Sequence, residues 1–113
     1  MTEARSTVLR RQYDDLRHRI DAADTPARPV CLNYIRSTFN SIRDAYELAS
    51  NADRERMMKA VLEVSRKLWD EGNRPQVLAL GVVMLNLESR FVEGDDANYV
   101  KVETDALIKE ASS

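Results

Sequence analysis

The residue types that most often carry out chemistry in proteins are scarce in this chain. It contains one histidine, His18, and one cysteine, Cys31, among its 113 residues. A Cys–His pair is a possible activated nucleophile, but these two residues would have to meet across a proline-containing segment. We interpret His18 as a solvated surface residue and Cys31 as a small thiol on an apolar helix face. The sequence therefore predicts no catalytic residue and no enzymatic activity.

The chain also lacks the sequence motifs that are typical of metal-binding and phosphate-binding sites. One histidine and one cysteine cannot form the four-ligand set of a structural zinc site. The acidic pairs Asp14-Asp15 and Asp95-Asp96 are adjacent in sequence, so on a helix their side chains diverge by about 100°. The three glycines stand far apart, and no glycine-rich phosphate loop is present. We expect no metal ion and no cofactor.

Composition and charge narrow the class of protein. Hydrophobic residues make up 43% and charged residues 32% of the chain, which is typical of a folded domain. The formal net charge of -2 divides unevenly: residues 1–36 are net basic, 37–92 are balanced and 93–113 are net acidic. This polarity is far weaker than the basic stripe of a protein that binds phosphate backbones. The single cysteine and the lack of a charged-then-apolar leader predict a cytoplasmic protein.

The strongest fold signal is a run of nine residues, 77–85, without a charged or hydrogen-bonding side chain. As a helix, this run is apolar at every angle and must be covered on all sides. It is too short to cross a membrane as a helix, which needs about 20 apolar residues. A buried strand is the alternative, but apolar residues continue to Phe91, Pro75 stands in front, and no partner strands are evident. We predict an all-α bundle of four to five helices, one domain over 1–113, with a central helix at about 75–92.

Two segments before the central helix have helical spacing of apolar residues. The first, about 30–49, has one ordinary apolar face. The second starts near residue 52, with Ser50 or Asn51 as its cap, and stops before Gly72. Its apolar stripe covers about 200° of arc, so we expect it to touch two neighbouring helices.

Two features leave alternatives open. In the helix before Gly72, Met57 and Met58 together with Trp69 are able to form an adaptable binding groove, although we favour packing in the core. The C-terminal segment 96–111 has a helical seam, but part of it also alternates as a strand does. We favour a fifth helix there.

The N-terminal segment, residues 1–24, is predicted to be a helix with a narrow apolar seam. The seam residues are spaced by four, three and four positions, as in a coiled-coil contact: Leu9, Tyr13, Leu16 and Ile20. The segment 25–29 contains two prolines that interrupt the helical pattern. We therefore expect a semi-detached first helix, whose seam docks either on the rest of the domain or on a second copy of the chain.

These observations favour a small non-enzymatic protein that binds another protein, such as a regulator, adaptor, antiactivator or chaperone. The predicted partner-binding residues lie on the first helix: Leu9, Tyr13, Leu16, Ile20, Arg10 and Arg17. If the partner is a second copy of the chain, we expect a homodimer through this helix. The alternative function is a nucleic-acid-binding regulator that uses the arginines of the first helix as a dimer, which interleaved acidic residues disfavour.

Two further classes of binding are disfavoured. The short turn at Gly72 resembles the turn of a helix-turn-helix, but the helix after it is apolar all round and offers no polar side chains to base edges. The first helix has only a narrow apolar seam, whereas an interfacial membrane helix needs a bulky apolar face. We expect no membrane partner.

Overall fold

The computed structural model of the protein describes residues 3–22 and 27–112. Within these residues the chain forms five α-helices and no strand. The helices are α1 (Arg5–Asp21), α2 (Ala27–Leu48), α3 (Asn51–Asp70), α4 (Arg74–Ser89) and α5 (Asp95–Ala111). The predicted all-α bundle is confirmed, and the segment 96–111 is helical.

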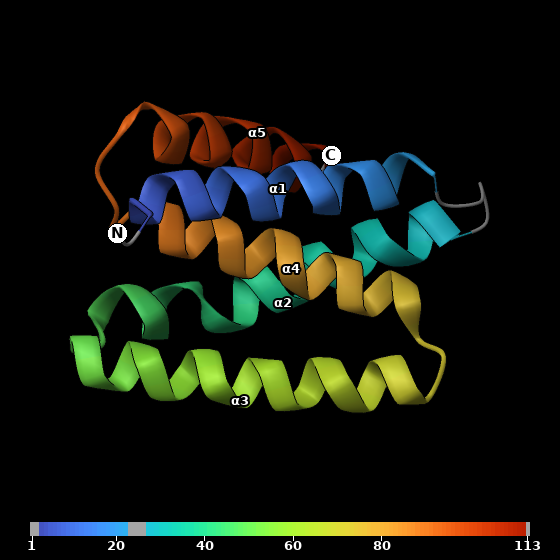
Figure 1. Ribbon diagram of the computed structural model, residues 1–113. Coiled ribbons are helices and arrows are strands. Elements are labelled where there is room, and N and C mark those ends of the chain that lie inside the picture. The colour runs from blue at the N-terminus through green and yellow to red at the C-terminus, as the bar shows by residue number, and fades with distance from the viewer. Residues whose placement is uncertain (1–2, 23–26, 113) are drawn as a thin grey trace.

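The helix α4 lies at the centre of the bundle and contacts each of the other four helices. Figure 1 shows it between α1 and α5 on one side and α3 on the other. Nine of its sixteen residues are buried, and Val82, Val83 and Leu87 have no exposed surface. Full burial of one such side chain contributes about 1.5–3 kcal/mol. The apolar run therefore forms the middle of the core, as its sequence predicts.

Local turn and cap chemistry sets the helix ends, with one departure from expectation. Gly72 has a φ of 81° between α3 and α4, and the Ser50 hydroxyl accepts a hydrogen bond from the Asp53 N–H at 3.1 Å. Pro29, expected in a connector, instead lies in the first turn of α2. The N–H groups of a first turn have no acceptor within the helix, so a proline there removes no hydrogen bond.

The helix α1 packs along α4 and α5, so its seam docks on the rest of the domain, which is one of the two alternatives that the sequence left open. Its Leu9 and Tyr13 are buried in a cluster with Leu85 of α4 and with Ala97 and Val100 of α5. The remaining part of the expected connector lies outside the described residues. The narrow seam is covered because α5 returns beside α1 and supplies a second wall, which the spacing within α1 alone does not reveal.

A glycine within the apolar run lets α1 approach α4 closely. A Cβ atom at Gly81 would lie only 3.2 Å from Leu16 Cδ1. A glycine inside a helix costs up to about 1 kcal/mol relative to alanine. The contact of Leu16 with the bare α4 backbone gives this glycine a packing role.

One polar network, centred on the buried Asn86 side chain, ties α4 to its neighbours. The Asn86 side chain is fully buried, and its Nδ2 donates to Thr104 Oγ1 at 3.0 Å and to Asp105 Oδ1 at 2.7 Å. Arg90 donates to the same Asp105 and, at 2.6 Å, to Glu47 of α2. A buried polar group that loses its partners costs about 1–3 kcal/mol. The network therefore favours one register of α4 against α5 and α2.

The helix α3 forms an outer layer of the bundle (Figure 1). It packs mainly on α4, and none of its residues 51–70, all of which the structure describes, is buried. Met57, Met58 and Val61 are half-buried against the main core. The contact of α3 with a second helix is slight: Arg54 Cζ lies 6.0 Å from the centre of the Tyr46 ring of α2, whereas α1, α2 and α5 occupy the other sides of α4. Part of the wide apolar stripe of α3 is consequently left uncovered.

The packing of α1 predicts that Leu9→Ala destabilises the whole domain. Leu9 has no exposed surface, and truncation of a buried leucine costs about 2–5 kcal/mol. Leu48→Ala is the matched control, because Leu48 is 88% exposed and should change stability by less than about 0.5 kcal/mol. Urea unfolding followed by circular dichroism measures both. A detached α1 would leave the main transition of Leu9→Ala at the wild-type midpoint.

The central position of α4 predicts that Val83→Asp, like Leu80→Asp, prevents folding. An unpaired carboxylate in the core costs several kcal/mol, a large part of the about 5–15 kcal/mol that stabilises a typical domain. Val102 is exposed on α5, so Val102→Asp should cost less than about 1 kcal/mol. Thermal melting followed by circular dichroism compares the variants. A cooperative transition of Val83→Asp at the wild-type midpoint would contradict the central role of α4.

Candidate functional site

The apolar seam predicted to bind a partner is used within the chain. Leu9, Tyr13 and Ile20 are buried, and Leu16 is half-buried against the same core. A protein partner would reach Leu9 and Tyr13 only if α1 left the bundle. Apolar groups that remain accessible lie elsewhere on the described surface, at the ends of α1 and α3 and along α3.

The arginines of α1 are engaged in ion pairs with nearby carboxylates. Arg10 and Arg17, the two predicted partner-binding cations, each pair with an aspartate one turn further along α1. The full set of pairs is Arg5–Glu88, Arg10–Asp14, Arg10–Asp96, Arg11–Glu3, Arg17–Asp21 and Arg19–Asp15. Phosphate binding by this face would require these pairs to break.

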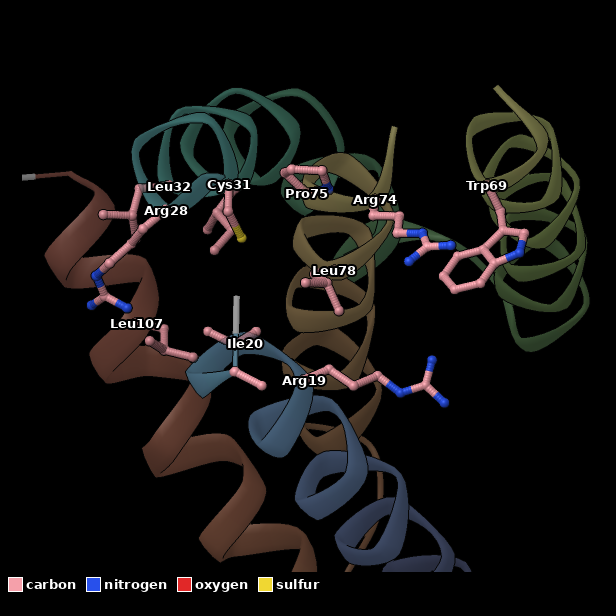
Figure 2. A pocket seen from close by; sticks show the side chains of 12 residues that line it. Arg19, Ile20, Arg28, Cys31, Leu32, Trp69, Arg74, Pro75, Leu78 and Leu107 are labelled. Atoms are coloured by element: carbon pink, nitrogen blue, oxygen red, sulfur yellow. The ribbon is translucent and has the colours of Figure 1, made fainter. Parts of the chain in front are cut away.

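A pocket of about 480 Å³ opens where α1 and α3 end and where α2 and α4 begin, with α5 as one wall (Figure 2). This volume lies within the range of about 300–1,000 Å³ that is typical of small-molecule sites. No acidic side chain is among the described residues that line it. Most of the lining is apolar: Ile20, Ala22, Cys31, Leu32, Ile35, Trp69, Pro75, Leu78 and Leu107.

Three arginines complete the lining, and they differ in their partners. Arg19 and Arg28 each form an ion pair with a carboxylate. Arg74 has no carboxylate within ion-pair distance among residues 3–22 and 27–112, and its Cζ lies 4.8 Å from the centre of the Trp69 ring. Figure 2 shows Arg74 between Trp69 and the pocket interior. The cation–π contact holds a guanidinium at the mouth of the pocket without neutralising it.

The outer side of α3 continues from this pocket as an exposed apolar edge. Leu62 is 51% and Trp69 is 45% exposed, and their separation of seven residues places them on one side of the helix. Lys59 and Arg66 are the neighbours of Leu62 three and four positions away, and neither forms an ion pair within the described part of the chain. We call Leu62, Trp69, Lys59, Arg66 and Arg74 together the α3 edge.

Sequence reasoning found only part of this surface. It grouped Met57, Met58 and Trp69 as one potential groove, whereas the structure turns the two methionines to the core and leaves Trp69 at the edge. It did not identify Leu62 or Arg74. The signal that pointed to Leu62 is the width of the stripe, because about 200° of apolar surface is more than one neighbouring helix covers. Arg74 lies on α4, and no sequence pattern pointed to it.

Cys31 lines the pocket as a buried thiol. Burial raises the pKa of this thiol, and the nearby positive charge of Arg28 lowers it in part. His18 is exposed on α1 and does not line the pocket. Because the thiolate is the reactive form of cysteine, a raised pKa makes Cys31 a poor nucleophile at neutral pH.

Further observations bear on the remaining classes of site. Among residues 3–22 and 27–112, no cluster of three or more His, Cys, Asp or Glu side chains is placed to hold a metal ion. Within the same residues, no helix has the length and apolar character needed to span a bilayer. No family model, curated protein or solved structure matches the chain. The pocket and the α3 edge are therefore the features from which function must be argued.

The buried position of Cys31 predicts slow alkylation whose pH dependence is shifted upward. The raised pKa should place the midpoint of the native rate profile above that of an ordinary thiol, roughly 8.5. Mass spectrometry after timed exposure to iodoacetamide, in native buffer and in denaturant, gives both profiles. A native midpoint at or below that of the denatured chain would contradict the burial of this thiol.

Proposed function

We propose that this protein acts without catalysis, by binding another protein along the α3 edge. Such a role suits a small regulator, adaptor, antiactivator or chaperone in the reducing cytoplasm. The observation that supports it is the unusual position of α3, an amphipathic helix with one main neighbour and an exposed apolar edge. Large apolar side chains that are exposed beside charged ones are typical of protein interaction sites.

The chemistry of the α3 edge favours an acidic amphipathic helix as the partner segment. Leu62 and Trp69 are two helical turns apart, the spacing at which anchors at i and i+7 of a partner helix meet them. Lys59, Arg66 and Arg74 lie beside them without carboxylate partners among the described residues, so acidic side chains of a partner would complete ion pairs. Tryptophan and arginine are also the residues that most often dominate binding energy.

The charges of the α3 edge and of α1 favour a second copy of the chain or a nucleic acid less than an acidic helix. Two copies of the α3 edge, related by a two-fold axis, would place like charges together, which disfavours a homodimer through this surface. Nucleic-acid binding by α1 competes with the ion pairs that its arginines already form. An acidic helix satisfies both the apolar and the cationic groups of the α3 edge.

A photo-crosslinking amino acid at position 62 tests this proposal in the native cell. We expect it to capture a protein whose crosslinked segment is an acidic amphipathic helix. The same amino acid at position 102, where Val102 is exposed on α5, is the matched control and should not capture that protein. With the captured partner purified, Leu62→Glu should weaken binding by at least about tenfold, and added salt should weaken it further.

Stability measurements separate a binding defect from unfolding. Leu62 is half-exposed, so Leu62→Glu should melt within a few degrees of the wild-type protein. Equal crosslinking from positions 62 and 102 would exclude the α3 edge as the binding surface. Undiminished binding of the partner to Leu62→Glu would exclude it as well.

A further inference from the structure

We propose that the pocket beside Trp69 binds a small monocarboxylate with an apolar body, such as a medium-chain alkyl carboxylate or an aryl carboxylate. The proposal does not depend on a protein partner for α3. It rests on three properties of the pocket: its preformed apolar interior, the distribution of charge at its mouth, and the single arginine there that has no carboxylate partner among the described residues.

The interior of the pocket is part of the folded core. Ile20, Cys31, Ile35 and Leu107 are buried residues from α1, α2 and α5, so packed helices define its shape. Water is a poor occupant of an apolar space, because an ordered water needs two to four polar partners. An alkyl or aryl group that enters the pocket gains contacts with these side chains and releases water.

The mouth of the pocket selects for negative charge. Its charged lining consists of arginines, and no carboxylate is among the described lining residues. In Figure 2 the Arg19 and Arg74 side chains extend on the side of the pocket nearer Trp69, whereas Arg28 extends on the side of α5. An anionic head group near Trp69 would therefore meet positive charge, with its apolar body directed toward Cys31 and Leu78.

Arg74 sets the charge and the shape of the head group. Its planar guanidinium can donate two parallel hydrogen bonds to one carboxylate, and the Trp69 ring restricts its position. Arg19 and Arg28 are already paired with carboxylates. One available guanidinium matches one negative charge, whereas a phosphate group, with up to two charges and more acceptor oxygens, would leave acceptors unmatched.

Two native probes report on occupancy. The chain contains one tryptophan and one cysteine, and both line the pocket. Titration of the full-length protein with octanoate should change Trp69 fluorescence and slow the modification of Cys31 by a small thiol reagent, with the same half-saturation. Octanol has the apolar body without the charge, and acetate has the charge without the body. Each should bind at least about tenfold more weakly than octanoate.

Variants assign the binding to the pocket. Arg74→Gln should weaken octanoate binding by about tenfold without weakening octanol binding. Leu78→Trp should fill the pocket and abolish the protection of Cys31. Arg56→Gln removes an exposed arginine of α3 outside the pocket and should bind octanoate as the wild-type protein does. Thermal melting of each free variant confirms that it is folded.

Three results would overturn the proposal. The first is no octanoate-dependent protection of Cys31, including the case in which Trp69 fluorescence alone changes, since the ligand would then lie outside the pocket. The second is equal affinity for octanol and octanoate. The third is wild-type octanoate binding by folded Arg74→Gln. Because these assays use the protein alone, their outcome is independent of crosslinking at position 62.

Discussion

The burial of the apolar middle of α4 is the constraint on which the rest of this structure depends. A helix that is apolar on every side must be surrounded, and here α1, α2, α3 and α5 each cover part of it. Gly81 allows α1 to approach on one side, and the hydrogen bonds of Asn86 favour one register of α5. Each covering helix uses one face for this purpose. Its other face is then available to solvent or to a partner.

The candidate site arises because the four helices that cover α4 contact one another unequally. α1 and α5 also contact each other, as do α2 and α5, whereas α3 has α4 as its main neighbour. The width of the α3 stripe therefore exceeds the surface available to cover it. The turn at Gly72 then brings Arg74 back over the Trp69 ring at the end of this uncovered stripe. Apolar surface and an available cation thus meet at one place in the fold.

The arginines of α1 that the sequence predicts for partner binding form ion pairs within the folded chain. Arg10 and Arg17 each have an aspartate four residues later, a spacing at which helical side chains meet. These ion pairs form within one helix, so the spacing of the residues in the sequence predicts them. The pairing of Arg5 with Glu88 of α4 depends instead on where the helices lie. So does the lack of a carboxylate partner for Arg74 among residues 3–22 and 27–112. The residues of the candidate site were consequently harder to predict than the helices that carry them.

Spacing and local chemistry in the sequence by themselves determined the helical class, the central segment 77–85, the turn at Gly72 and the cap at Ser50, because each depends on residues within a few positions. The sequence placed Pro29 in a connector, whereas it lies in the first turn of α2. A helix tolerates proline there because the N–H groups of its first turn have no acceptor within the helix. Only the tertiary structure decided that the α1 seam is covered by α5 and that α3 is left with an exposed edge. Periodicity shows which face of a helix is apolar, but contacts between distant segments decide which apolar faces are covered and how much remains exposed.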